Sequence, residues 1–142
     1  MKLLAPSIKN KANTPVRIDL SGYTVQADEG EISLDGQFVD VVSVESDNFK
    51  KIDLRLKREI ASGANYDEQT IDCIIKSAVI IGWSFEEPCN EENKVLLFKT
   101  WPSAITNYIV SRAEGLAKVK YSTPMLTSSA NTRNENIGSE VR

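Results

Sequence analysis

The sequence contains no histidine among its 142 residues. Histidine is the most common general base in enzymes and the most common protein ligand for transition metals. Its absence excludes most Ser-His-Asp catalytic sites and most zinc sites. The chain also has no glycine-rich phosphate-binding loop of the Walker or dinucleotide type. Any catalysis would have to rely on carboxylates, lysine or cysteine, and we predict no catalytic residue, no cofactor and no bound metal ion.

Cysteine is scarce as well, with two residues in the chain. Two cysteines do not form the disulfide framework of a small secreted domain, so we expect Cys73 and Cys89 to be free thiols. Activating Cys73 as a nucleophile would require a nearby cation, base or helix N-terminus. Its sequence neighbours are Asp72 and Ile74. We therefore interpret Cys73 as a small buried apolar residue.

Long apolar runs and an excess of positive charge are also missing. No stretch approaches the roughly 18 apolar residues that span a bilayer, and Lys76 and Ser77 interrupt the best run, residues 73–83. Pro6 interrupts the apolar start, which therefore does not resemble a secretory signal. The net charge of -3 gives no general attraction to nucleic acid. These features predict a cytoplasmic protein that binds neither membranes nor nucleic acid.

Two local concentrations of charge need an interpretation. The acidic loop around Pro88 could hold calcium, but its spacing matches no calcium loop and no glycine supplies the sharp turn. The basic segment 50–58 could contact phosphates or an acidic protein. We interpret both as solvated surfaces. The acidic residues are Glu86, Glu87, Glu91 and Glu92, and the basic residues are Lys50, Lys51, Arg55, Lys57 and Arg58.

The N-terminal half is expected to contain strands. Val16, Ile18 and Leu20 alternate with polar residues, which predicts a half-buried strand. Asp35-Gly36 separates two further β-type runs and predicts a tight type I′ hairpin turn before a strand at residues 38–44.

Helices are expected from residue 47 onward. Apolar residues at helical spacing favour a helix over 49–60, although alternating Ile52, Leu54 and Leu56 also fit a strand. A second helix is expected to begin near Asp67 and to run through residues 71–81, and a third to cover 90–100. Thr100 is expected to cap the last helix, with Pro102 in its first turn.

These patterns predict an α+β fold, mostly helical, with a small N-terminal antiparallel β-meander followed by about four helices. Residues 1–14 show no apolar period and are expected to be a flexible arm, and residues 15–120 a single globular domain. Residues 121–142 are rich in Ser, Thr and Asn, which predicts a disordered C-terminal tail.

Large aromatic residues are concentrated at two predicted helix junctions. Aromatic side chains dominate both protein cores and protein interfaces, and the sequence alone does not separate the two uses. We expect most of them in the core and one or two at an interface. The candidates for protein contact are Trp83, Phe85, Trp101, Pro102, Ile105 and Tyr108.

The segment "TWPSAI" at residues 100–105, followed by the helix "TNYIVSRAEGLAKV", resembles the tail assembly chaperones of long-tailed, lambda-like bacteriophages. In that family a Thr-Trp-Pro step opens a late helix. The segment "IIGWSFEEPCNEENKVLLF" is similar to another feature of the group: an apolar helix ending at Gly-Trp, an acidic loop, and a short helix. The resemblance spans residues 67–118.

The resemblance implies a protein without enzymatic activity that coats the long helical tape measure protein and self-associates in a ring or spiral. It also implies that a programmed frameshift can append a second domain to some copies, and that this longer form recruits the tail tube protein. Such a chaperone acts in the cytoplasm of the bacterial host and is absent from the mature virion. The alternatives are a structural protein of the phage head-tail junction or tail and, ranked last, a nucleic-acid-binding regulator that uses residues 50–58.

Overall fold

The computed structural model describes residues 2–117, so the tail predicted at 121–142 lies outside the described residues. This part of the chain contains five helices and five strands. The helices are α1 (Ala5–Asn13), α2 (Asp47–Ala61), α3 (Glu68–Ser77), α4 (Glu91–Thr100) and α5 (Ser103–Gly115). The strands are β1 (Val16–Asp19), β2 (Thr24–Ala27), β3 (Gly30–Ser33), β4 (Phe38–Val41) and β5 (Ile80–Trp83).

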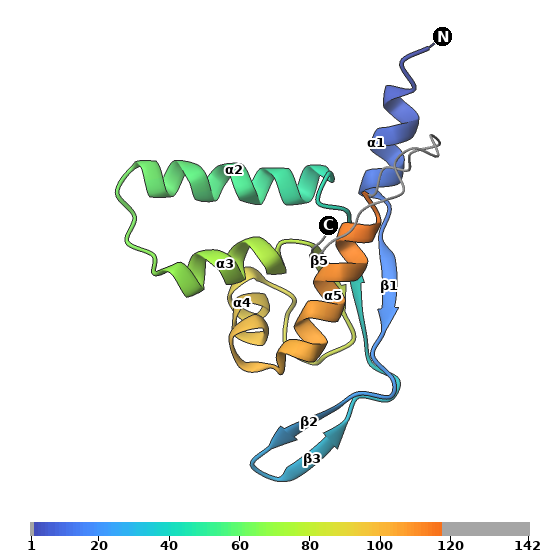
Figure 1. Ribbon diagram of the computed structural model, residues 1–142, viewed down its shortest axis with the longest axis vertical. Helices are drawn as coiled ribbons and strands as arrows, with labels where there is room; N and C mark the ends of the chain where they lie inside the picture. Colours follow the sequence, from blue (N-terminus) through green and yellow to red (C-terminus); the bar gives the residue numbers. More distant parts are fainter. Residues whose placement is uncertain (1, 118–142) are drawn as a thin grey trace, which may run out of the picture.

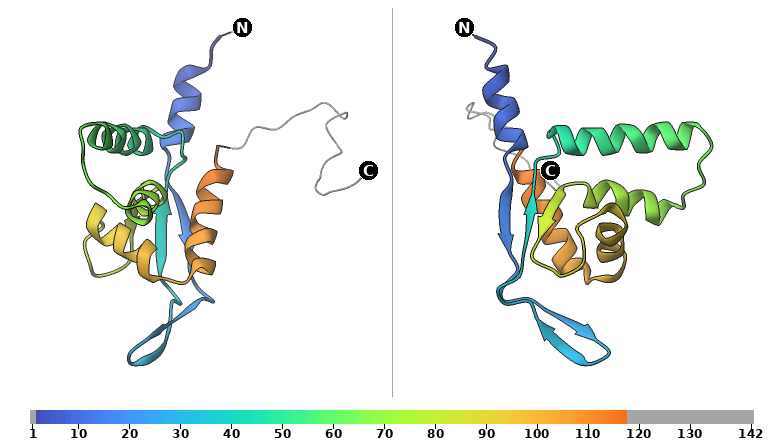
Figure 2. Two further views of the ribbon diagram at one scale, coloured as in Figure 1. Left: turned by 60° about the vertical axis from the view of Figure 1, so that its left-hand side comes forward. Right: turned by 180° about the vertical axis from the view of Figure 1, so that it is seen from behind.

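The fold is α+β, mostly helical, with antiparallel strands in its N-terminal half, as predicted. A three-stranded antiparallel sheet has the order β1-β4-β5, and β2 pairs with β3 in a separate hairpin. Helix α5 crosses the sheet in Figure 1, with α3 and α4 on the β5 side. Figure 2 shows that the β2–β3 hairpin and α1 project from opposite ends of the molecule.

The core lies between the sheet and α5. Ile18 pairs with Val39 and Val41 pairs with Ile80, and all four side chains are fully buried. Because strand residues alternate between faces, residues of this register share the buried face of the sheet. Helix α5 contributes residues at i, i+4 and i+8, a spacing that puts them on one helix face. These are Ile105, Ile109 and Ala113.

The segment at residues 47–61 is a helix, as the apolar spacing over 49–60 favoured, and not the strand that the alternation at residues 52–56 also allowed. The side chain of Ser46 caps α2 by accepting a hydrogen bond from the backbone N–H of Phe49, at 3.2 Å. Asp67 and Asn90 cap α3 and α4 in the same way, by accepting from the N–H groups of Thr70 and Asn93. Each cap satisfies a backbone donor that has no partner within its helix.

The hairpin predicted at Asp35-Gly36 is wrong, because β3 pairs with β2 and β4 pairs with β1 and β5. The chain does turn there, with the N–H of Gln37 donating to the carbonyl of Leu34 at 3.0 Å. Only Gly36 has positive φ, at 81°, whereas a type I′ turn requires positive φ at both central residues. The turn therefore redirects the chain from the hairpin into the sheet.

The helix predicted over residues 71–81 ends earlier, at Ser77, and Ile80–Trp83 form strand β5. The backbone N–H of Val42 donates to the carbonyl of Val79 at 2.9 Å, which continues the pairing of this segment with β4. Val79, Ile80 and Ile81 are β-branched residues, which favour strands. Pairing with the open edge of β4 therefore makes residues 80–83 a strand, although their apolar pattern predicted a helix.

Two smaller expectations also differ from the structure. Residues 5–13 form helix α1, where we expected an arm without regular structure. Thr100 is the last residue of α4 and does not cap α5, and Pro102 occupies the cap position of α5. The residue before a proline avoids the helical region, and Trp101 accordingly has ψ of 154°. The Trp-Pro step therefore ends one helix before the next begins.

Candidate protein-interaction site

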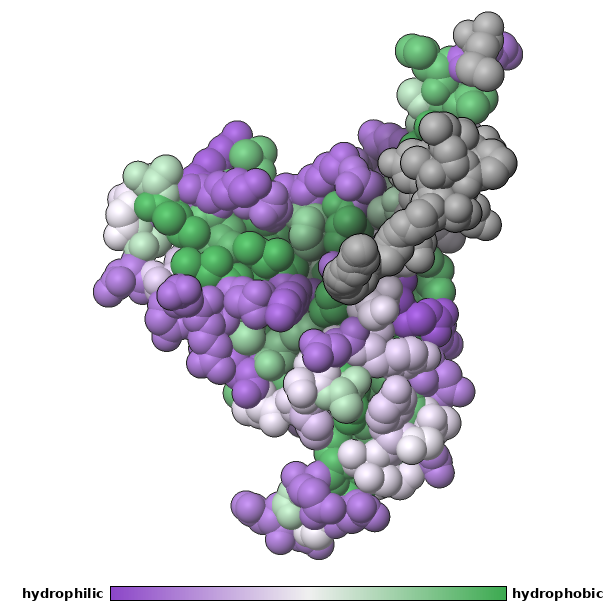
Figure 3. Space-filling model, viewed as in Figure 1, coloured by the Kyte–Doolittle hydropathy of each residue, from purple (hydrophilic) through white to green (hydrophobic). Residues whose placement is uncertain are grey.

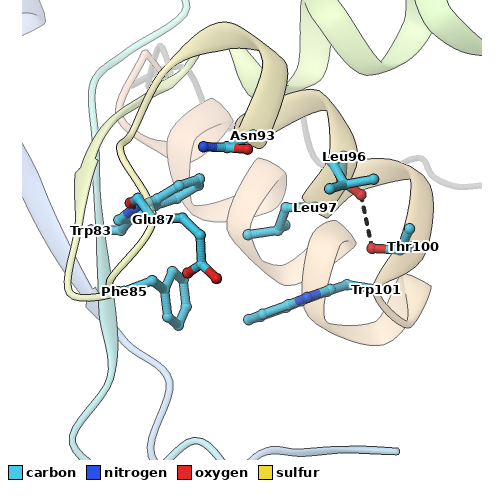
Figure 4. Close-up of a pocket in the computed structure, with 8 residues that line it drawn as sticks. All are labelled: Trp83, Phe85, Glu87, Asn93, Leu96, Leu97, Thr100 and Trp101. Carbon is cyan, nitrogen blue, oxygen red and sulfur yellow. Dashed lines mark hydrogen bonds between the residues drawn. The ribbon is translucent and has the colours of Figure 1, made fainter. Parts of the chain in front are cut away.

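Three of the predicted aromatic residues form a cluster where β5, the following loop and α4 meet. The ring of Phe85 lies between the two tryptophans, with centroids 5.4 Å from Trp83 and 5.4 Å from Trp101. Both contacts are edge-to-face, an arrangement that the charge distribution of aromatic rings favours. All three side chains are half-buried. Figure 4 shows them on one side of the hollow that they help to form.

This aromatic cluster borders a hollow of about 250 Å³. A second hollow, of about 420 Å³, lies between α3 and α4 and is lined by residues that include Ile74 and Val95. Asn93 and Leu96 line both hollows, and Leu96 is 55% exposed. We call the two hollows and Leu96 the α4 surface. The first hollow is lined by Trp83, Phe85, Glu87, Asn93, Leu96, Leu97, Thr100 and Trp101.

The helical repeat explains how α4 contributes to this surface. Asn93, Leu96, Leu97 and Thr100 are spaced i, i+3, i+4 and i+7, so they share one face of the helix. The side-chain amide of Asn93 donates to the carbonyl of Pro88 at 2.9 Å, which ties the preceding loop to α4. The hydroxyl of Thr100 donates to the carbonyl of Leu96 at 2.8 Å (Figure 4).

The indole of Trp83 is held at the edge of the same hollow. Its N–H donates to the backbone carbonyl of Glu87 at 2.8 Å. This bond satisfies the one polar group of the side chain, so the remaining ring surface is free to make apolar contacts. The Glu87 side chain is exposed at the rim. The hollow therefore has apolar walls and a polar edge, the usual composition of a protein-binding surface.

A buried lysine fixes α4 against the sheet. Lys94 is 7% exposed, and its ammonium donates to the backbone carbonyl of Ile80 at 3.0 Å. Burial lowers the pKa of Lys94, because a desolvated ammonium is destabilised, and the nearby Cys89 and Glu91 only partly offset this. Burial likewise raises the pKa of the half-buried Cys89 thiol. Both cysteines are free, and Cys73 is buried as predicted.

The other residues predicted for protein contact lie elsewhere. Ile105 is 1% exposed and belongs to the core, so it is not on the surface. Pro102 is exposed at the start of α5. The ring of Tyr108 packs against Tyr23, with centroids 5.6 Å apart, and its hydroxyl accepts a hydrogen bond from Arg112 at 3.0 Å. The structure thus brings together Trp83, Phe85 and Trp101, places Pro102 next to Trp101 at the start of α5, and places Ile105 in the core and Tyr108 against Tyr23.

The main residue that the sequence reasoning missed is Leu96. Leu96 is the most exposed apolar residue of α4, in the helix that the sequence predicted over 90–100. The available signal was the spacing of Leu96 from Asn93 and Thr100, three residues before it and four residues after it, which places the three on one face of the helix. Periodicity identifies a shared face but does not say whether another element of the chain covers it.

A second apolar surface is visible between α2 and α3. Figure 3 shows a hydrophobic strip between these helices, bordered by hydrophilic residues on both sides. Ile60, near the end of α2, is exposed. Contiguous apolar surface with a polar rim is typical of protein-binding faces. This strip is a further surface that a partner protein could cover.

The described residues contain no group of three or more Cys, Asp or Glu side chains placed to hold a metal ion. Within residues 2–117, no helix is both long enough and apolar enough to cross a bilayer. The side chains that line the α4 surface offer apolar contact, with hydrogen-bonding groups at the rim. Comparison with protein-family models, curated protein sequences and solved structures finds no match for this chain.

Proposed function

We propose that this protein is a bacteriophage tail assembly chaperone that binds the tape measure protein through the α4 surface. The exposed side chain of Leu96, between two hollows and beside the aromatic cluster, is the observation that carries the proposal. The resemblance of residues 67–118 to such chaperones supports it, because this segment contains β5, the acidic loop and α4. Tryptophan, tyrosine and arginine supply much of the binding energy at protein interfaces, and the contacts around them exclude water.

The shape of the α4 surface suits a helical partner. An amphipathic helix places apolar side chains at i, i+3, i+4 and i+7 along one face. Two hollows separated by one leucine can accept apolar side chains from successive turns of such a helix. A tape measure protein is a long helical chain whose apolar face needs cover before the tail tube forms around it. Covering that face would keep the partner soluble in the bacterial cytoplasm.

The same proposal includes the other partners that the resemblance implies. Copies of the chain self-associate along the tape measure protein, and a frameshifted longer form recruits the tail tube protein. The apolar strip between α2 and α3 supports repeated contacts with protein, since it adds a second exposed apolar surface (Figure 3). Assembly chaperones leave before the particle is complete, so this protein is not expected in the virion.

Co-expression with a tape measure protein from the same genome tests the proposal. We expect the tape measure protein to become soluble and to copurify with the chaperone, because its apolar helical face is covered. A tape measure protein that stays insoluble and unbound in the presence of the folded chain would contradict the proposal. Mass spectrometry of purified particles tests the alternative of a structural protein, which would be retained in the virion.

A further inference from the structure

A third hollow, of about 510 Å³, lies along one side of α2 and carries positive charge. Lys51, Leu54 and Arg58 are spaced i, i+3 and i+7, so they line one side of the helix. Leu54 is 48% exposed. Within residues 2–117, neither Lys51 nor Arg58 has a carboxylate within 4 Å, whereas Arg55 in the same hollow is paired with Glu59 and Glu91. We call this site the α2 hollow. It combines an exposed leucine with two cations that have no counterion in the described chain.

The β2–β3 hairpin has the opposite charge. No Lys or Arg occurs between Arg17 and Lys50, and the hairpin contains Asp28, Glu29 and Glu31. In the described part of the chain, none of these carboxylates is within 4 Å of a basic group. Ile32 is 44% exposed and pairs across the hairpin with Val25, so both share one face. The hairpin thus presents an exposed isoleucine beside an acidic tip at Asp28 and Glu29.

From this complementarity we infer that the acidic hairpin of one copy docks in the α2 hollow of a second copy. Helix α2 and the β2–β3 hairpin lie on opposite sides of α3, α4 and α5 in Figures 1 and 2, so the hairpin does not reach the α2 hollow of its own chain. Each copy offers one hairpin and one hollow. A head-to-tail contact of this kind repeats from copy to copy and generates either a closed ring or an open filament.

Long side chains bridge the dimensions of the two surfaces. Leu54 is three residues from Lys51 and four from Arg58 on α2, rises of about 4.5 and 6 Å. Ile32 follows Glu29 by three residues, a distance of about 10 Å along an extended strand. The long side chains of Glu29, Lys51 and Arg58 can cover the remaining few ångströms, so Ile32 can contact Leu54 while Glu29 reaches one of the two cations. Opposite charges at the rim orient the contact, and the apolar pair excludes water from its centre.

This inference rests on the self-association included in the proposed function and names the two surfaces through which copies meet, whereas binding of the tape measure protein by the α4 surface is tested separately. Sedimentation velocity over a range of protein concentrations tests it, with two variants that reverse the charges. Lys51→Glu with Arg58→Glu makes the hollow acidic, and Asp28→Lys with Glu29→Lys makes the hairpin basic. We expect the wild type to self-associate, more weakly at high salt, and each variant to raise the dissociation constant at least about 10-fold.

Mixing the two variants provides the decisive measurement. The basic hairpin of one variant matches the acidic hollow of the other, so an equimolar mixture should regain association that neither variant shows alone. Lys2→Glu with Lys11→Glu is the matched control, since it reverses the same number of charges in the N-terminal segment, outside α2, and should leave association unchanged. Circular dichroism checks that all variants fold.

Three results would overturn the inference: a wild type that stays monomeric, single variants that associate like the wild type, or a mixture that gains nothing. A fourth result would also overturn the inference: a wild type that binds DNA, and a Lys51→Glu/Arg58→Glu variant that loses DNA binding but keeps self-association. That result would assign the α2 hollow to nucleic acid. Neither these results nor their opposites decide whether the α4 surface binds the tape measure protein, so the two proposals fail separately.

Discussion

At the scale of single residues, Phe85 holds the aromatic cluster together. Its ring contacts both Trp83 and Trp101, whereas no direct ring contact between the two tryptophans occurs in the described structure. Loss of the Phe85 ring therefore removes both contacts at once. The sequence indicated that these residues were important but did not distinguish the central residue from its neighbours, because that role depends on how the loop after β5 folds back toward α4.

We expect Phe85→Ala to lower the free energy of unfolding by about 2 kcal/mol, less than for a fully buried phenylalanine because this side chain is half-exposed. Urea unfolding followed by tryptophan fluorescence measures the change. Phe85→Leu keeps part of the apolar volume and should cost about half as much. A Phe85→Ala variant as stable as the wild type would mean that the ring contacts do not stabilise the fold.

Lys94 is a second residue whose behaviour follows from its surroundings. Desolvation lowers its pKa in the folded chain, so the native state binds this proton less tightly than the unfolded state does. The resulting destabilisation is fully present below the lowered folded pKa. This destabilisation disappears as the pH rises from the lowered pKa to the ordinary lysine pKa of about 10.4. Stability due to this residue therefore increases with pH in the alkaline range.

The variant Lys94→Met keeps the side-chain length and removes the titrating group. We expect the stability of the wild type relative to Lys94→Met to rise as the pH increases from neutral toward about 10, because the buried charge is lost. Urea unfolding of both proteins across this range measures the difference. Lys99→Met, an exposed lysine on the same helix, is the control for general effects of losing a lysine. A difference that is constant or falls with pH would contradict the burial of a charged Lys94.

At the scale of elements, the sequence predicts best where the signal is local. The signals for a helix over 49–60 and for a helix beginning near Asp67 are contained within a few residues, and the structure confirms both helices. Strand β5 was predicted as helix because its identity depends on pairing with β4, about 40 residues away in the chain. The same reason explains the wrong hairpin prediction at Gly36. The turn itself depends on neighbouring residues, but β4 pairs with β1 and β5, which are distant in the sequence.

Gly36 offers a test of the turn between the hairpin and the sheet. We expect Gly36→Ala to lower the free energy of unfolding by about 1 kcal/mol or more, because φ of 81° is strained for alanine although its Cβ would meet no atom within 4 Å. Thermal unfolding of the variant measures this. Gly115→Ala, in α5 with equally open space, is the control and should raise stability by about 0.5–1 kcal/mol. Equal effects of the two substitutions would contradict the role of the positive φ.

At the scale of the whole molecule, the sequence predicted the fold class and the aromatic content of the site but not how its surfaces are distributed. Ile105 and Trp101 are close in sequence, yet one is in the core and the other borders a hollow. The α2 hollow and the acidic hairpin also became recognisable only in three dimensions, because their separation on opposite sides of α3, α4 and α5 decides that they cannot pair within one chain (Figure 1). Composition does not contain this information.

The central claim is that the α4 surface binds a helical protein partner. The dissociation constant of the tape measure protein, measured by calorimetry for the wild type and for Leu96→Glu, tests it most directly. Ile8→Glu in α1 is the matched control, since it places the same charge on an exposed apolar position of another helix. We expect Leu96→Glu to weaken binding about 30-fold, as for a central interface residue, and Ile8→Glu to leave it unchanged. Wild-type affinity in a correctly folded Leu96→Glu variant would contradict the claim.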